Sequence, residues 1–120
     1  MAKMKQVLVV EDEEIIRNSL QRLLERYNYK VDGASSVKES LENYNLDDFD
    51  VIISDLRLPG AAGTDLIKIT KTPVLIMTSY SSIRSAIDSM KMGAVDYIAK
   101  PFEHQEMICL LYTSPSPRDS

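Results

Sequence analysis

The chain has 120 residues, enough for one domain with a single sheet, and its 44% hydrophobic and 27% charged residues are ordinary for a globular protein. The 14 basic and 18 acidic residues give a net charge of −4, which argues against binding nucleic acid directly through a broad basic surface. No apolar run reaches the length of a membrane span, and a single cysteine excludes an internal disulfide and fits a cytoplasmic location.

The first part of the chain alternates a short apolar run with a segment of helical period. Residues 6–10 predict a strand, and residues 12–27 predict a helix with Glu13 and Glu14 in its first turn. The inner face of this helix carries apolar side chains at helical spacing: Ile16, Leu20, Leu23, Leu24 and Tyr27. Residues 29–34 predict a second strand.

A second helix is marked by its start. Ser36 and Glu39 form a capping-box pattern, in which each side chain bonds a backbone N–H at the beginning of a helix. The apolar stripe of this helix is predicted to contain Val37, Leu41 and Tyr44. Residues 51–53 are apolar throughout, which is typical of a central strand that is buried on both faces.

The second half of the chain continues the alternation. Residues 58–63 predict a loop, 65–69 a short helix, 74–77 a buried strand and 95–99 a last strand. A fourth helix is predicted to start after Ser82 and end near Gly93. Its expected inner face is Ile83, Ala86, Ile87 and Met90. A fifth helix is expected after Pro101 and Phe102.

Five strands alternating with helices predict a parallel α/β sheet with helices on both faces. In such a sheet, functional sites form beyond the carboxyl ends of the strands. The residues at these ends are Glu11, Asp12, Ser54, Asp55, Thr78, Ser79 and Lys100. We therefore expect three acids, a hydroxyl and an amine to meet on one rim of the sheet.

This set of side chains suits one kind of chemistry. Crowded carboxylates repel one another unless a cation lies among them, and oxygen ligands without histidine or cysteine suit Mg²⁺. A carboxylate such as Asp55 is also a competent nucleophile toward phosphorus. Lys100 would neutralise the phosphoryl oxygens and the Thr78 hydroxyl would bond one of them.

Four blocks resemble the signature blocks of bacterial response-regulator receiver domains, in the order and spacing of that family. They are VVEDE (9–13), VIISDLRLPG (51–60), LIMTS (75–79) and GAVDYIAKPF (93–102). The resemblance covers about residues 5–108 and implies a flavodoxin-like (βα)5 fold with strand order 2-1-3-4-5. It also implies a phosphoacceptor domain of a two-component system, which is not an enzyme acting on a separate substrate.

The resemblance assigns roles to the rim. Asp55 would accept a phosphoryl group from a sensor histidine kinase. Asp12, Asp55 and the backbone carbonyl of Arg57 would bind Mg²⁺, with Glu11 acting mostly through water. Thr78 and Lys100 would hold the phosphoryl oxygens, and Thr78 and Tyr97 would form a conformational switch.

The sequence departs from the family in two places, neither at the nucleophile. Glu11 replaces the commoner Asp, and the 64–72 segment leaves room for a third helix of only about two turns. The resemblance also suggests a cis bond before Pro101, while Arg57 and Tyr80 lie where the family tunes dephosphorylation.

Each of these residues also has an ordinary structural explanation. Asp55 alone could be a turn or cap residue, and Thr78 and Ser79 could be capping hydroxyls. Lys100 could be a surface lysine and Tyr97 an inert core aromatic. It is the agreement of four separate strand ends that favours phosphoryl chemistry. The only histidine, His104, is given no role.

The end of the chain differs in character from the rest. The segment CLLYTSPSPRD (109–119) resembles one reading frame of a sequencing-library adapter. We therefore expect a receiver domain over residues 1–108 with a truncated fifth helix, followed by a non-native tail over 109–120. The alternative is a natural, disordered Ser/Pro-rich tail.

Three readings of the function remain open. The blocks MTSYSSIRSA (77–86) and AKPFEH (99–104) most resemble receivers fused to ATP-dependent activators of an alternative sigma factor, with a stand-alone receiver as the alternative. In the first case the output domain is missing, and homodimers could form through the fourth helix, fifth strand and fifth helix. A haloacid-dehalogenase-type phosphatase would need an acid where this chain has Arg57. A phosphorylation-independent module would be expected to lack rim residues, yet all are present.

Overall fold

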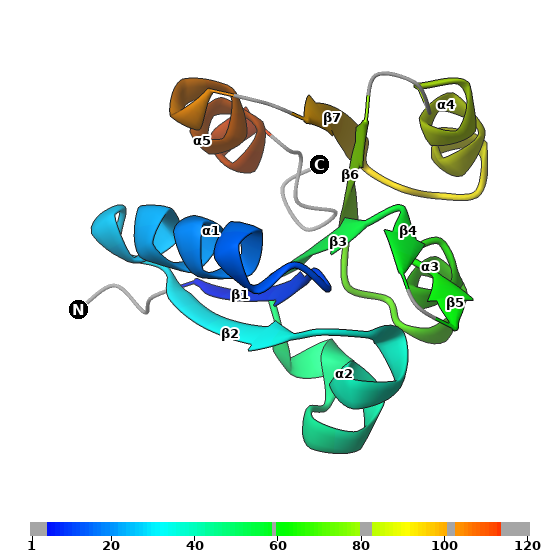
Figure 1. Ribbon diagram of the computed structural model, residues 1–120, viewed down its shortest axis with the longest axis horizontal. Helices are drawn as coiled ribbons and strands as arrows, with labels where there is room; N and C mark the ends of the chain where they lie inside the picture. Colours follow the sequence, from blue (N-terminus) through cyan, green and yellow to red (C-terminus); the bar gives the residue numbers. More distant parts are fainter. Residues whose placement is uncertain (1–4, 59, 80–82, 101–102, 114–120) are drawn as a thin grey trace.

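The computed structural model describes residues 5–58, 60–79, 83–100 and 103–113. Strands and helices alternate along these residues (Figure 1). The elements are β1 (Gln6–Val10), α1 (Glu14–Arg26), β2 (Lys30–Ala34), α2 (Val37–Asn43), η1 (Leu46–Asp48), β3 (Val51–Asp55), β4 (Arg57–Leu58), β5 (Ala61–Ala62), α3 (Asp65–Ile69), β6 (Val74–Ser79), α4 (Ile83–Lys91), β7 (Asp96–Lys100) and α5 (His104–Thr113).

The main sheet has five strands in the order β2-β1-β3-β6-β7, and every pair in it is parallel. Because β6 and β7 are the fourth and fifth strands of this sheet along the chain, the expected order 2-1-3-4-5 is confirmed. The register pairs Val10 with both Ala34 and Ser54, and Ser79 with Lys100. These pairs bring the carboxyl ends of the strands together at one edge.

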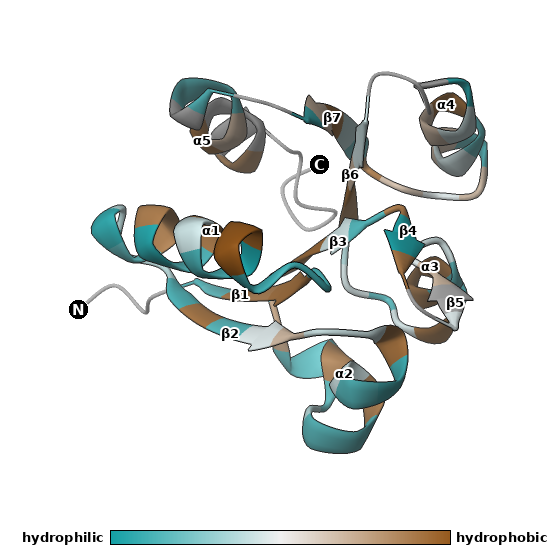
Figure 2. Ribbon diagram, in the orientation of Figure 1, coloured by the Kyte–Doolittle hydropathy of each residue, from teal (hydrophilic) through white to brown (hydrophobic). Residues whose placement is uncertain are grey.

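Helices cover both faces of the sheet, as the alternation predicted. Figure 1 shows α1 and α5 on one face and α2, α3 and α4 on the other. Side chains of β1 alternate between two cores: Val7 and Val9 pack toward α1 and α5, whereas Leu8 and Val10 pack on the opposite side. Figure 2 shows hydrophobic residues along the strands in the middle of the sheet.

Some predicted helix faces were wrong in detail. Helix α1 starts at Glu14 and ends at Arg26, so Tyr27 is its C-cap and lies exposed. Leu41 on α2 and Ile87 and Met90 on α4 are also exposed. Helix α4 buries Ala86, as predicted, and also Ser89, because the backbone of a helix docked through small side chains approaches the sheet closely. The side chain of Ile83, also predicted on this face, lies outside the described part of the structure.

The segment after β3 holds a feature that the sequence did not indicate. Residues 58–63, predicted as a loop, include a two-stranded antiparallel hairpin that pairs Arg57 with Ala62 and Leu58 with Ala61. Helix α3 has the predicted bounds, Asp65–Ile69, although its five residues make less than the two turns expected. The turn thus returns the chain toward the end of β3 before a short helix begins.

The capping box at α2 is confirmed with one change. The Ser36 hydroxyl accepts a bond from the Glu39 backbone N–H at 3.1 Å. The Glu39 carboxylate, however, accepts from the N–H and hydroxyl of Ser35 rather than from the N–H of Ser36. Both oxygens of Glu39 therefore tie the end of β2 to the start of α2.

Helix α5 buries Met107 and Ile108, as expected, and runs on to Thr113. The domain boundary at residue 108 and the non-native origin of the tail stay predictions. The expected cap Ser82, Tyr80, Pro101 with its suggested cis bond and residues 114–120 lie outside the described residues. Among the described helices, none is both long enough and apolar enough to cross a membrane.

Candidate functional site

The parallel register collects the predicted site residues at one rim of the sheet. Glu11 and Asp12 follow β1, Asp55 ends β3, Thr78 is the next-to-last residue of β6 and Lys100 ends β7. Strands β3 and β6 are apolar until their last two residues, so their polar side chains emerge only where the sheet ends. The convergence expected from the strand ends is therefore observed.

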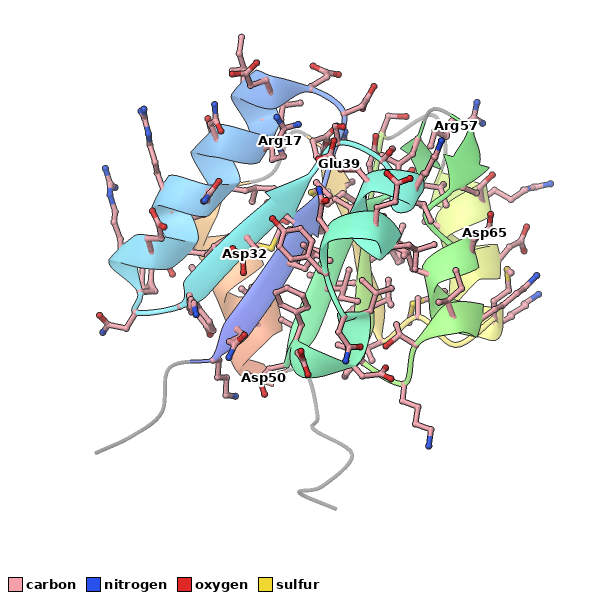
Figure 3. All side chains as sticks on the ribbon, turned by 90° about the horizontal axis from the view of Figure 1, so that it is seen from below. Arg17, Asp32, Glu39, Asp50, Arg57 and Asp65 are labelled. Carbon is pink, nitrogen blue, oxygen red and sulfur yellow. The ribbon has the colours of Figure 1, made fainter. Side chains whose placement is uncertain are left out.

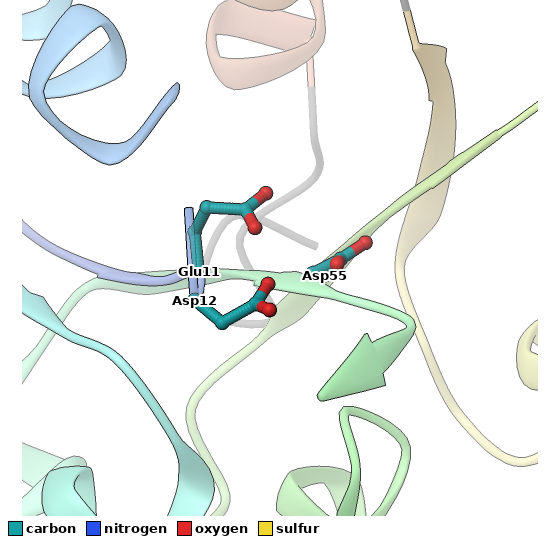
Figure 4. A group of neighbouring side chains, drawn as sticks. All are labelled: Glu11, Asp12 and Asp55. Carbon is teal, nitrogen blue, oxygen red and sulfur yellow. The ribbon is translucent and has the colours of Figure 1, made fainter. Parts of the chain in front are cut away.

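Three carboxylates form the centre of this rim. Glu11, Asp12 and Asp55 each place one oxygen within 4.8 Å of the others (Figure 4). The Glu11 side chain is fully buried, Asp55 is partly buried and Asp12 is exposed to solvent. The group offers oxygen ligands only, which matches the preference of a hard divalent cation such as Mg²⁺.

Lys100 bridges two of the three acids. Its Nζ lies 3.2 Å from Glu11 Oε1 and 3.3 Å from Asp55 Oδ1. The Lys100 side chain is 19% exposed, so the amine lies at the mouth of the site rather than free in solvent. This places one positive charge directly beside the carboxylate predicted to act as the nucleophile.

Burial and mutual repulsion shift the acids toward their neutral forms. Burial, the hydrogen bond with Asp12 and the charge of Asp55 raise the pKa of Glu11 to about 7, against the opposing effects of Glu13 and Lys100. Burial also raises the pKa of Asp55, although Lys100 draws it down. Burial destabilises the ionised forms of these two acids. A cation bound beside them would stabilise those ionised forms, so the site favours cation binding.

Lys100 responds in the complementary direction. Burial alone would lower the pKa of its amine, but the carboxylates of Asp55 and Glu11 outweigh burial and raise that pKa. Lys100 is therefore firmly protonated at neutral pH and available as a cation and hydrogen-bond donor.

The hydroxyl side of the rim is held differently. Thr78 is buried, and its hydroxyl donates a 3.3 Å bond to the carbonyl of Ser79. Tyr97, on the neighbouring strand β7, is partly buried and packs against the core between the sheet and helices α2 and α3. The Arg57 side chain is exposed on β4. The roles of Thr78 and Tyr97 as a switch and of the Arg57 carbonyl as a ligand stay predictions.

Two residues that shape the site, Arg17 and Gly63, were missed from the sequence, and the bond made by a third, the strand-end residue Ser54, was not anticipated. The Arg17 guanidinium donates to the backbone carbonyl of Glu11 at 2.7 Å, and the Ser54 hydroxyl donates to that of Asp55 at 3.0 Å. Gly63 returns the chain against Asp55, where a Cβ would lie 2.2 Å from the Asp55 carbonyl oxygen. The sequence signal for this close approach was the glycine itself, Gly63, at the end of the loop predicted over residues 58–63.

Comparison with known proteins agrees with this geometry. Residues 7–112 match the family model described as the response regulator receiver domain. The chain is 36% identical over 106 residues to the transcriptional regulatory protein ZraR of Klebsiella oxytoca, a match covering 84% of this chain and 24% of that protein. It is 33% identical over 113 residues to the transcriptional regulatory protein FixJ of Bradyrhizobium diazoefficiens, covering 88% and 54%.

Solved structures share the fold over nearly the whole chain. A response regulator receiver domain protein from Clostridium thermocellum superposes with a TM-score of 0.87 at 31% identity, covering 97% of this chain and 98% of the other. The chemotaxis response regulator CheY4 of Vibrio cholerae gives 0.84 at 28% identity, covering 94% and 100%. The chain spans about a quarter of ZraR and about half of FixJ, the curated relatives that it matches.

Proposed function

The chain belongs to the response regulator receiver family, and on that premise we propose that Asp55 accepts a phosphoryl group in a Mg²⁺-dependent reaction. The observation that carries this proposal is the convergence of Asp55 with two further acids and Lys100 at one rim. The convergence matters because the four groups come from three different strand ends, those of β1, β3 and β7, whereas an ordinary turn aspartate needs no such neighbours.

The residues present suit the metal that the family implies. Glu11, Asp12 and Asp55 supply closely spaced carboxylate oxygens, and we propose the backbone carbonyl of Arg57 as a further ligand. Bound there, Mg²⁺ would offset negative charge on the acids and on the incoming phosphoryl oxygens. The raised pKa values of Glu11 and Asp55 support the need for that charge.

The proposed reaction forms one bond and breaks another. A carboxylate oxygen of Asp55 attacks phosphorus, the bond from phosphorus to the imidazole nitrogen of a kinase phosphohistidine breaks, and the imidazole takes up a proton. Lys100 would shift its contact from the free carboxylate to a phosphoryl oxygen, which keeps its charge paired throughout. The product is an acyl phosphate on Asp55, so the domain serves as a signalling phosphoacceptor.

Intact mass spectrometry tests this assignment. We expect incubation with Mg²⁺ and acetyl phosphate to add one phosphoryl group to the wild-type chain, and expect no addition in Asp55→Asn or without Mg²⁺. Asp88→Asn, which alters an exposed acid on α4, is the matched control and should be phosphorylated normally. An adduct that persists in Asp55→Asn, or a folded wild-type chain that gains none, would contradict the proposal.

We further propose that phosphorylation switches the surface beside Thr78. Among the described residues, the Thr78 hydroxyl has one partner, a carbonyl at 3.3 Å, and so weak a bond would let it turn toward a phosphoryl group; Tyr97 lies on the adjacent strand. Phosphorylation would then shift a two-state equilibrium of the segment between them. Amide NMR signals of residues 78–97 should move on phosphorylation, and unchanged signals there would count against the switch.

On this proposal, the chain is the receiver domain of a longer protein, and the output domain is another part of that protein. ZraR and FixJ are transcriptional regulatory proteins of which the chain spans only part. We therefore propose that a sensor histidine kinase phosphorylates this domain in the cytoplasm, and that an ATP-dependent transcription activator is the output. Homodimer formation through α4, β7 and α5 is one route by which the switched surface could act. A stand-alone receiver is the alternative, and sequencing the gene beyond residue 108 would separate the two.

A further inference from the structure

Arg17 links α1 to the loop that carries the two adjoining acids. Its guanidinium Nη1 donates a 2.7 Å hydrogen bond to the backbone carbonyl oxygen of Glu11. That carbonyl belongs to the peptide unit that joins Glu11 to Asp12, so the bond fixes the plane of the peptide between the two acids. A charged donor makes this bond stronger than an ordinary one between neutral groups.

The other contacts of this loop do not fix that peptide. The Glu11 N–H completes the β1–β2 ladder by donating to Ala34 at 3.0 Å. The Glu11 carboxylate accepts from the Glu13 N–H and from Lys100, and it also shares a hydrogen bond with the Asp12 side chain. These bonds hold Glu11 on its amino side and by its side chain. Arg17 bonds the backbone carbonyl of Glu11, on the other side of the residue. The orientation of this peptide helps to set the direction in which the Asp12 side chain leaves the main chain.

Strand β2 is shaped to receive the Arg17 side chain. A Cβ built on Gly33 would lie 3.1 Å from Arg17 Cδ and 3.4 Å from Cγ, so the methylene stem rests on the bare backbone of Gly33. In Figure 3, Arg17 and Glu39 lie at the same end of the sheet, whereas Asp50 lies at the opposite end. The Arg17 charge also helps to lower the pKa of Glu39, after the larger effects of Ser35.

We propose that Arg17 is a positioning residue for the metal-binding acids: seated on Gly33, it orients the peptide between Glu11 and Asp12 and so sets the geometry that Mg²⁺ meets. This inference rests on the proposed function. Arg17 acts through the main chain, because its guanidinium donates to the backbone carbonyl of Glu11. It is the kind of outer contact that orients a ligand without touching the metal.

Magnesium affinity, measured by NMR titration of the full chain, tests the proposal. Arg17→Met keeps most of the side-chain stem and removes the donor, and should raise the Mg²⁺ dissociation constant by about tenfold. Arg22→Met changes an exposed arginine on the same helix and should leave it within about twofold of wild type. Arg17→Lys keeps a cationic donor on a shorter chain and should recover part of the loss.

Gly33 provides a second test that leaves Arg17 in the sequence. Gly33→Ala should displace the Arg17 stem and raise the Mg²⁺ dissociation constant by roughly threefold, a smaller effect than removal of the donor. In an Arg17→Ala background, Gly33→Ala should add nothing, because there is no stem left to displace. Urea unfolding without Mg²⁺ measures any general loss of stability separately, and Gly33→Ala and Arg17→Lys still decide the matter if Arg17→Met does not fold.

The outcomes separate this inference from the proposed function. A wild-type chain that binds no Mg²⁺ would overturn both. Wild-type binding together with an unchanged dissociation constant in Arg17→Met would overturn the positioning role alone. A loss of unfolding free energy in Arg17→Met with no change in Mg²⁺ affinity would likewise show that Arg17 serves only the fold.

Discussion

The two halves of the rim are held to different degrees. On the β1 side, Glu11 is bonded through its N–H, its carbonyl and both carboxylate oxygens, by Ala34, Arg17, Glu13 and Lys100 respectively. On the β6 side, the Thr78 hydroxyl makes one bond within the described part of the chain, at 3.3 Å to the next carbonyl. Glu11 is thus held by four bonds before any ligand arrives, whereas the described contacts hold the Thr78 hydroxyl by one long bond.

The helices behind the two halves show the same contrast. Helix α1 buries Leu20, Leu23 and Leu24 against the sheet. Helix α4 buries Ala86 and Ser89, while Ile87 and Met90 are 46% and 37% exposed. Among the described side chains, α4 buries less apolar area than α1, so the energy required to move it is expected to be lower. A receiver needs both properties, since the acids must be preorganised and the responding surface must be able to shift.

The largest expected effect concerns the anchoring of α1. Leu24→Ala removes a fully buried side chain and should lower the free energy of unfolding by about 3 kcal/mol, because it leaves a cavity in the core. Leu41→Ala, at the exposed leucine of α2, is the matched control and should change it by less than about 0.5 kcal/mol. Urea unfolding measures both. Similar losses for the two variants would contradict the burial that distinguishes them.

The acid half should also show a pH dependence without metal. The folded-state pKa of Glu11 is about 7 against an ordinary value of 4.5, so between these values the folded state binds more protons than the unfolded state. Unfolding free energy should therefore fall as pH rises from about 4.5 to about 7, by on the order of 2 kcal/mol, and level off above. The raised pKa of Asp55 acts in the same direction.

Glu11→Gln separates this effect from other titrations. The variant cannot ionise at residue 11, so most of the decline between pH 4.5 and 7 should disappear in EDTA-treated protein. Glu39 and Asp47 have lowered pKa values, and their stabilisation is lost only as pH falls below their ordinary values of 4.5 and 3.8, outside this window. A decline of equal size in Glu11→Gln would show that another group is responsible.

Hydrogen exchange sharpens the comparison between the two helices. The backbone amide of Met90 on α4 should open with a free energy at least about 1 kcal/mol below that of Leu24 on α1, since fewer large apolar side chains hold α4. Both residues lie in the later turns of their helices, which makes them comparable. Equal protection of the two amides would show that the small residues dock α4 as firmly as leucines dock α1.

Periodicity predicted the fold well where large side chains decide the packing. The bounds of β1 and the buried leucines of α1 followed from the spacing of apolar residues. The inner face of α4 followed only in part: Ala86 is buried as predicted, but close docking on the sheet selects Ser89 in place of the larger Ile87 and Met90. The β4–β5 hairpin was missed because a two-residue strand has too few residues to show a period.

The site was predictable to the extent that it depends on strand ends. Glu11, Asp12, Asp55, Thr78 and Lys100 came from the rule that parallel strands end at one edge. Arg17 was not found, because its role depends on a side chain crossing from α1 to a carbonyl, which no local pattern records. Gly63 was missed for the same reason, since its close approach to Asp55 appears only when the chain is folded. Ser54 was placed at its strand end, but the local bond from its hydroxyl to the Asp55 carbonyl was not anticipated.

The smallest expected effect concerns the exposed apolar residues of α4. Ile87→Gln should change the free energy of unfolding of the monomer by less than about 0.5 kcal/mol, because the residue is already largely in contact with water. Urea unfolding at low protein concentration, compared with Ala86→Gln at the buried neighbour, measures this directly. Ala86→Gln should be clearly more destabilising, since it forces a polar side chain into the contact with the sheet. A loss of more than about 1 kcal/mol in Ile87→Gln would mean that α4 turns this residue inward in solution, and the contrast between a fixed and a movable half of the rim would then fail.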